Sequence, residues 1–160
     1  MHPSKMVSAP VVCGVDGSEH SRRAFREAVT LARALDARLD VVMAWQPGTS
    51  SYDGYLPAPE RTPKVVAYGI LEDTVRAEFG DERPEWLTVH AESGHPGKVL
   101  VEASGDAALL VVGSRGASEL ASPFLGSVSL YCTTQARCPV LVVRPEAKLT
   151  EPKRSTEDTT

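Results

Sequence analysis

The sequence lacks the features that mark several protein classes. It holds no apolar run of about eighteen residues, which excludes a membrane-spanning helix. Its first ten residues lack the apolar stretch of a secretory signal, so we expect a cytoplasmic protein. Cysteine is scarce, because Cys13, Cys132 and Cys138 are an odd number without metal-ligand spacing. That pattern argues against a zinc site and against a disulfide framework.

An excess of basic charge is also absent. Lys and Arg number 17 against 21 Asp and Glu, and the net charge is -4. Binding to nucleic acid depends on a basic face that neutralises phosphates, so we expect no nucleic-acid partner. The length of 160 residues suits one domain, and a chain of this size buries roughly two-thirds of the surface that its unfolded form exposes.

Five short apolar runs predict strands, at residues 11–15, 39–45, 86–91, 109–113 and 139–143. The first and the last two are nearly continuous and rich in valine. This is typical of parallel strands covered by helices on both faces. The second and third runs partly alternate between apolar and polar residues, which indicates a less buried face or a position near the sheet edge.

Helical patterns fill the gaps between these runs. We predict helices over residues 18–37 and 63–79, a third that begins at Pro96, and a fourth over about 127–135. Ser18 can cap the first helix, and Pro96 suits a first helical turn. The predicted apolar stripes are Phe25, Ala28, Val29, Ala32 and Leu35; Tyr68, Leu71, Val75 and Phe79; and Val99, Leu100 and Ala103.

The alternation of strands and helices predicts an α/β fold with three layers, α/β/α, around a parallel sheet. Three segments fall outside this plan. Residues 46–62 are rich in proline, glycine and polar residues and are interpreted as a long mobile loop. Residues 145–160 have few apolar side chains and are predicted to be a disordered tail. Residues 1–8 are predicted to be a flexible N-terminus, which leaves one domain over 9–144.

The stretch VVGSRGASELASPFLGSVS carries the most specific chemistry. A buried strand ends at Gly113, Gly116 follows, and a helix begins after Gly126. Glycines allow positive φ and let the backbone approach an anion, while the first amides of a helix point outward with the positive end of its dipole. Two other interpretations stay open. The segment can be an ordinary connection, since strands followed by glycines and a helix are common, and Ser127 can be no more than a helix cap. The pattern fits neither a Walker loop nor the dinucleotide fingerprint.

The spacing Gly113, two residues, Gly116, nine residues, Gly126 and Ser127 resembles the nucleotide-binding motif of the universal stress protein family, in its ATP-binding subgroup. The segments VVCGVDGSEHSRRAFREAV, SGHPGKVLVEAS and RCPVLVV resemble the same family, in the same order. The resemblance covers residues 9–144. It implies an open, Rossmann-like sheet of five parallel strands in the order 3-2-1-4-5, as in adenine nucleotide alpha hydrolase-like folds.

In that strand order the ends of the first and fourth strands lie side by side, where ligands of open α/β sheets bind. Asp16 resembles the family aspartate beside the adenosine, and an ordinary turn residue is the alternative interpretation. The resemblance implies that the adenine and ribose are lined by Gly14, Val15, Ala44, Val112 and Gly113.

The phosphates, by the same resemblance, are held by backbone amides and hydroxyl groups. The residues implied are Gly116, Gly126, Ser127, Val128 and Ser129. Arg115 lies in the same loop and either adds a charge contact or is a solvated surface arginine.

The family implies an ATP-binding stress-response sensor or adaptor, with or without Mg²⁺, and cyclic AMP is the alternative ligand. Catalytic patterns do not stand out, because there is no Gly-x-Ser-x-Gly elbow, and His20, His90 and His95 are scattered. We therefore expect slow ATP hydrolysis at most. An interaction module without a ligand is a third interpretation, and the complete set of glycines counts against it.

The sequence of the last predicted strand indicates that copies of the protein associate. Val140, Leu141, Val142 and Val143 form an apolar strand without proline or lysine, and in the implied order this strand is a sheet edge. The resemblance implies a two-fold homodimer through it. The alternative is a monomer whose tail folds back over the edge.

Overall fold

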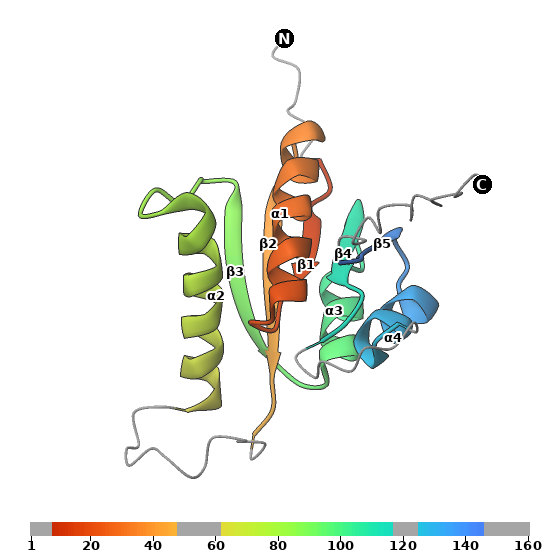
Figure 1. Ribbon diagram of the computed structural model, residues 1–160. Coiled ribbons are helices and arrows are strands. Elements are labelled where there is room, and N and C mark those ends of the chain that lie inside the picture. Colours follow the sequence, from red (N-terminus) through yellow and green to blue (C-terminus); the bar gives the residue numbers. More distant parts are fainter. Residues whose placement is uncertain (1–7, 48–61, 117–124, 146–160) are drawn as a thin grey trace, which may run out of the picture.

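The structure, a computed structural model, describes residues 8–47, 62–116 and 125–145 (Figure 1). The predicted N-terminus, most of the predicted loop, the middle of the glycine segment and nearly all of the predicted tail lie outside these ranges. Strands and helices alternate along the described chain, as the apolar runs predict. The elements are β1 (Val11–Gly14), α1 (Glu19–Ala34), β2 (Leu39–Trp45), α2 (Pro63–Phe79), β3 (Leu87–Ser93), α3 (Pro96–Ala103), β4 (Leu109–Gly113), α4 (Ser127–Gln135) and β5 (Val140–Val143).

The strands form one parallel sheet in the order β3-β2-β1-β4-β5, which confirms the predicted fold. Helices α1 and α2 cover one face of the sheet, and α3 and α4 cover the other (Figure 1). The carboxyl ends of β1 and β4 are neighbours. The helix that follows β1 lies on one face and the helix that follows β4 lies on the other, so the two chain segments diverge there and leave room between them.

Two apolar cores lie on the two faces of the sheet. The first, under α1 and α2, includes Val11, Phe25 and Leu71, and the second, under α3 and α4, includes Val12 and Leu110. Neighbouring residues of β1 enter opposite cores because side chains alternate along a strand. Both faces of the central strands are therefore buried, which accounts for their continuous valine runs.

An aromatic cluster closes the first core at its outer end. The rings of Phe25 and Phe79 lie edge to face with centroids 6.4 Å apart, and those of Phe79 and Trp86 lie 6.0 Å apart. The guanidinium of Arg33 lies 5.7 Å from both the Phe79 and the Trp86 ring centroids. Such cation–π contacts stabilise by about 0.5–1 kcal/mol each at exposed sites, so Arg33 joins the ends of α1 and α2.

Three predicted stripe positions were wrong. Leu35 follows the end of α1 and is 49% exposed, because the chain turns back toward β2 at Asp36, whose φ is 49°. On α2 the buried stripe is Ala67, Leu71 and Val75, and Tyr68 points outward with 39% exposure. Ala103, at the last position of α3, is also exposed.

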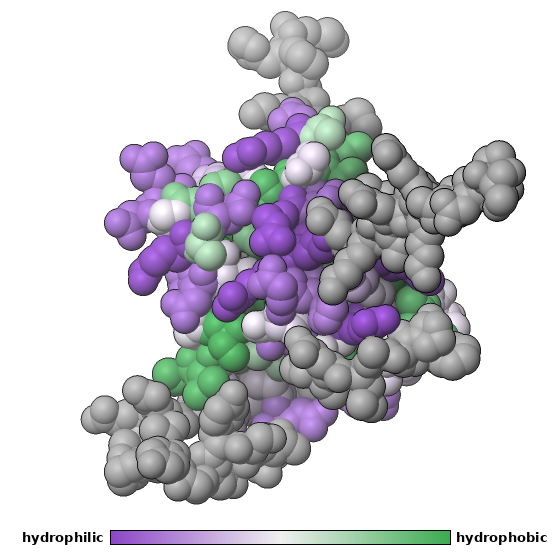
Figure 2. Space-filling view, in the orientation of Figure 1, coloured by the Kyte–Doolittle hydropathy of each residue, from purple (hydrophilic) through white to green (hydrophobic). Residues whose placement is uncertain are grey.

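The first turns of α2 expose valine. Val65 and Val66 are exposed, and Figure 2 shows hydrophobic residues gathered at this end of α2, at the lower left of a largely hydrophilic face. Among the helices of the described ranges, none is long and apolar enough to cross a membrane.

Candidate functional site

A cavity of about 280 Å³ lies where β1 and β4 end. Its wall is built from the ends of β1, β2 and β4 and the first turns of α3 and α4. The predicted binding residues all line it: Gly14, Val15, Asp16, Ala44, Val112, Gly113, Arg115, Gly116, Gly126, Ser127, Val128 and Ser129. The fold thus brings together residues that lie far apart in the sequence, and their binding role stays a prediction.

The structure adds five lining residues that the sequence did not predict: Ser21, Val42, Pro96, Leu100 and Leu125. Val42 and Leu100 belong to the second core and reach the cavity where α3 crosses the sheet. A β-carbon on Gly14 would lie 2.6 Å from Leu100 Cδ1, so a larger residue at this position would require the Leu100 side chain to shift. Together with Val15 and Ala44 these residues make the end of the cavity near β2 apolar.

Asp16 lies in the turn between β1 and α1, at a position compatible with both interpretations that the sequence left open. Its carboxylate Oδ1 accepts a 2.9 Å hydrogen bond from the Ser18 amide, as in an ordinary turn. The Asp16 amide in turn donates to Ser21 Oγ at 3.2 Å. At the same time Asp16 lines the cavity and is exposed within it. The turn therefore fixes a carboxylate at the mouth of the cavity.

The segment after β4 is held by backbone hydrogen bonds to its two neighbours in space. The Ser114 amide donates to the Val143 carbonyl at 2.9 Å, and the Gly126 amide donates to the Ser114 carbonyl at 2.8 Å. A β-carbon on Gly126 would lie 3.3 Å from the Ser114 carbonyl oxygen, and one on Gly113 would lie 3.0 Å from the His20 carbonyl oxygen. Because both neighbours are backbone atoms, a larger residue at either position would require the backbone to shift by a few tenths of an ångström.

Positive φ, which the sequence analysis also gave as a reason for glycine, occurs elsewhere. Among the glycines of the described ranges it is found at Gly17, Gly80 and Gly94. The N-cap Gly126 has a φ of -63°, which any residue adopts. The glycines of the motif therefore do not adopt a positive φ, and what they contribute is the absence of a side chain.

Helix α4 opens onto the cavity with uncapped amides. Its N-cap is Gly126, and no side chain caps the helix, so the interpretation of Ser127 as a cap was wrong. The amides of Ser127, Val128 and Ser129 belong to the first turn, where an α-helix offers no internal acceptors. With the helix dipole, they form a site that favours an anion.

Ser129 differs from the expectation. It is 2% exposed, and its hydroxyl donates to the Gly126 carbonyl at 2.9 Å. Its proton therefore holds the first turn of α4 together. Ser127, which is exposed at the cavity, is the better placed hydroxyl donor.

Two charged side chains line the cavity in the described residues, Asp16 and the half-buried Arg115. Arg115 therefore lies at the predicted phosphate end, rather than on a remote surface. His95 is the N-cap residue of α3 and its ring centroid lies 6.0 Å from that of Tyr131, outside the cavity wall.

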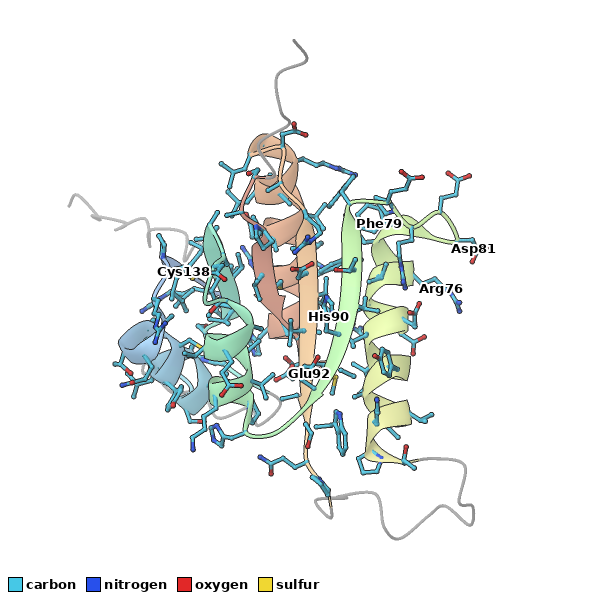
Figure 3. All side chains as sticks on the ribbon, turned by 180° about the vertical axis from the view of Figure 1, so that it is seen from behind. Arg76, Phe79, Asp81, His90, Glu92 and Cys138 are labelled. Atoms are coloured by element: carbon cyan, nitrogen blue, oxygen red, sulfur yellow. The ribbon has the colours of Figure 1, made fainter. Side chains whose placement is uncertain are left out.

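A second, polar cavity of about 320 Å³ lies between β3 and α3. Figure 3 shows its His90 and Glu92 on β3, on the sheet face that carries α3 and α4. Glu102 of α3 lines the same cavity. No group of three or more His, Cys, Asp or Glu side chains in the described part of the chain is placed to hold a metal ion.

Asp40, which lines the polar cavity, is the centre of a hydrogen-bonded network. Arg38 donates to the two Asp40 carboxylate oxygens at 2.9 and 3.0 Å, and the Thr88 hydroxyl donates at 2.6 Å. Partial burial raises the pKa of Asp40, but the hydrogen bonds from Arg38 and Thr88 and the charges of Arg38 and His90 outweigh it, so that the net pKa lies below its ordinary value.

Comparison with known proteins identifies a family and several relatives of this chain. Residues 9–144 match the family described as the Universal stress protein family. A universal stress protein of Thermus aquaticus is 35% identical over 140 residues, which cover 84% of this chain and 97% of that protein. One of Mycobacterium tuberculosis is 31% identical, and this chain spans 47% of its length.

Solved structures agree with the fold. A universal stress protein crystallised in complex with cAMP matches with a TM-score of 0.64 and 29% identity, over 86% of this chain and 97% of that one. The universal stress protein UspA of Lactobacillus plantarum matches with a TM-score of 0.63, covering 85% of this chain and 97% of its own, at 21% identity.

Proposed function

This chain belongs to the universal stress protein family, and on that premise we propose that it binds an adenine nucleotide, ATP in the first place, and acts as a stress-response sensor or adaptor. The observation that carries the proposal is the cavity between β1 and β4. One of its ends is apolar and the other is lined by the uncapped first turn of α4. A flat base and an anionic chain need this combination.

The apolar end suits the adenine. Val15, Val42, Ala44 and Leu100 line it. Burial of an aromatic base against such side chains is favourable by the hydrophobic effect. The backbone ends of β1 and β4 lie within reach for polar contacts to the base and the sugar.

The opposite end suits phosphate. Ser127, Val128 and Ser129 of the first turn of α4 and Arg115 line it, and their amides, the Ser127 hydroxyl and the Arg115 guanidinium would bind phosphate oxygens there. Asp16 is the carboxylate of the cavity, and a Mg²⁺ ion that enters with ATP would be held by Asp16 together with phosphate oxygens.

Cyclic AMP is the second candidate, and one specific observation favours it. A family member 29% identical to this chain was crystallised in complex with cAMP. Cyclic AMP has the same base but a single phosphodiester, so it would use the apolar end and less of the phosphate end.

Native mass spectrometry of the purified protein, before and after addition of ATP or cAMP, tests the proposal. We expect a mass increase of one adenine nucleotide per chain and displacement of a co-purified nucleotide by ATP. Calorimetric titrations with ATP, GTP and cAMP then rank the ligands. Absence of binding to ATP and to cAMP would contradict the proposed function, whereas equal binding of GTP would contradict recognition of the adenine.

A further inference from the structure

We propose that Arg144 is a further ligand-binding residue, which contacts the terminal phosphate of a nucleoside polyphosphate and makes the site prefer ATP over a monophosphate. The inference rests on the proposed function and adds to it a determinant of phosphate number. Arg144 lies directly after β5, outside the cavity wall described above.

The register of the sheet places Arg144 beside the phosphate end of the cavity. Val143 of β5 pairs with Gly113 of β4, and its carbonyl accepts the Ser114 amide at 2.9 Å. The Ser114 carbonyl accepts the Gly126 amide at 2.8 Å. One chain of backbone hydrogen bonds thus connects the end of β5, the loop after β4 and the N-cap of α4, and Arg144 is the next residue on the β5 side.

The alternation of side chains along β5 indicates the direction of the Arg144 side chain. Val142 packs against the core under α3 and α4, in the same cluster as Val128, and Val143 packs against the opposite core. Side chains alternate along an extended chain, so the next position returns to the α4 face. The first turn of α4 and the cavity lie on that face, so continued alternation beyond Val143 would direct the exposed Arg144 side chain toward them.

The order and spacing of the strands give an approximate distance scale along the bound ligand. From the apolar end, the cavity wall runs from Ala44 on β2, through Gly14 on β1, to Gly113 on β4, and β5 comes next. Neighbouring strands lie about 4.8 Å apart, so the span from β2 to β5 is about 14 Å. A nucleotide whose base lies over β2 would place its first phosphates over β4 and its terminal phosphate toward β5.

The chemistry of Arg144 fits this position. A guanidinium donates several hydrogen bonds in one plane and binds phosphate oxygens in pairs. Within the described ranges no ion pair involves Arg144, so its charge is not neutralised by a neighbouring carboxylate there. Arg115 already lines the cavity from the β4 side, and Arg144 would meet the phosphate chain from the β5 side.

Calorimetric titration of the full chain with ATP, ADP and AMP tests the inference, in the wild type, Arg144→Ala and Arg144→Lys. Arg137→Ala is the matched control. It removes the same charge from an exposed arginine that precedes β5, near the end of that strand opposite to Arg144. The ionic strength is held constant because long-range charge effects depend on it. Thermal unfolding without ligand checks that each variant folds.

We expect Arg144→Ala to weaken ATP binding about five- to tenfold and to leave AMP within about twofold, the scale of one exposed hydrogen bond to a charged group. Arg144→Lys should retain part of the ATP affinity, and Arg137→Ala should leave the affinities for ATP and AMP unchanged. Equal weakening of ATP and AMP by Arg144→Ala, or unchanged ATP binding, overturns the role of Arg144 while the proposed function stands. A wild type that binds none of the three nucleotides overturns both.

Discussion

The carboxylate of Asp16 lies against Gly116: a β-carbon on Gly116 would stand 3.3 Å from Asp16 Oδ2. The two residues are far apart in the sequence and belong to the turns after β1 and β4. Their contact joins the predicted adenosine end of the site to the predicted phosphate loop. A carboxylate this close to phosphates is favourable only when a hydroxyl donor or a cation lies between them.

We expect Asp16→Ala to weaken ATP binding by roughly 1–3 kcal/mol, the usual scale for loss of a hydrogen-bonding partner that carries a charge. The replacement also removes the acceptor of the Ser18 amide, so Asp16→Asn is the control, because its side-chain oxygen can still accept that bond. The increase in unfolding temperature caused by ATP measures the effect. If ATP protects Asp16→Ala as well as it protects the wild type, then Asp16 is a turn residue only.

A second prediction concerns close backbone approach at Gly126. We expect Gly126→Val to weaken ATP binding several-fold or more while the fold survives, because its β-carbon would lie 3.3 Å from the Ser114 carbonyl and 3.4 Å from Arg115 Cα. The loop after β4 must then shift away from the first turn of α4. Gly126→Ala should have a smaller effect in the same direction.

Gly69 supplies the control for this series. A β-carbon there would meet nothing within 4 Å, so Gly69→Ala should leave ATP binding unchanged and stabilise α2 by up to about 1 kcal/mol. Calorimetry gives the affinities and circular dichroism checks the folds. A folded Gly126→Val protein that binds ATP like the wild type contradicts the phosphate-loop assignment.

A third prediction concerns acid. The pKa of Asp40 is lowered in the folded protein, so the unfolded chain binds the proton more readily and acid favours unfolding. The stabilisation is complete above the ordinary aspartate pKa of about 4 and is lost as the pH falls through the lower pKa of the folded state. We expect Asp40→Asn to lose less stability than the wild type in this acidic window.

Urea unfolding at neutral pH and at a series of acidic pH values measures this difference. Asp73→Asn, at an exposed position of α2, is the control and should keep the acid sensitivity of the wild type. Thr88→Val removes one donor to Asp40 and should reduce the sensitivity in part. An identical pH dependence in Asp40→Asn and the wild type would rule out this network as its source.

Much of the fold could be predicted because local signals agree with the tertiary structure. The sequence predicts a helix from Pro63 to Phe79, and α2 has these bounds in the structure. Thr62 caps its start, and Gly80 ends it with a φ of 62°. Two of the errors, Leu35 and Ala103, lie at helix ends, and the third lies at the edge of the α2 stripe. Tyr68 and Ala67 are neighbours that both border the stripe, and packing against β2 and β3 decides that the smaller one is buried.

The candidate site divides in the same way. Residues within the glycine motif could be named from their spacing and from the family resemblance. Val42, Pro96 and Leu100 could not, because they reach the cavity through tertiary structure: Val42 pairs with Gly14 in the sheet, and Pro96 and Leu100 belong to α3, which packs on the sheet. The role of Gly126 also required the structure, since the sequence does not distinguish close approach from positive φ.

The last prediction concerns assembly through β5. The structure confirms that β5 is an edge of the sheet, and on it Leu141 is 36% exposed. An uncovered apolar edge strand pairs readily with another chain, and two copies related by a two-fold axis can pair through identical strands. We therefore expect a homodimer with Leu141 in its interface, and light scattering at micromolar concentration should give the mass of two chains.

Leu141→Lys is a cleaner test of that interface than Val142→Lys. Val142 packs against the core under α4, so a lysine there would also disturb the fold, whereas Leu141 contributes an exposed side chain. We expect Leu141→Lys to shift the protein toward the monomer with an unchanged circular dichroism spectrum. Leu130→Lys, at an exposed position of α4, is the control and should remain a dimer. A wild-type mass of one chain contradicts the dimer, and a dimer unaffected by Leu141→Lys places the interface on another surface.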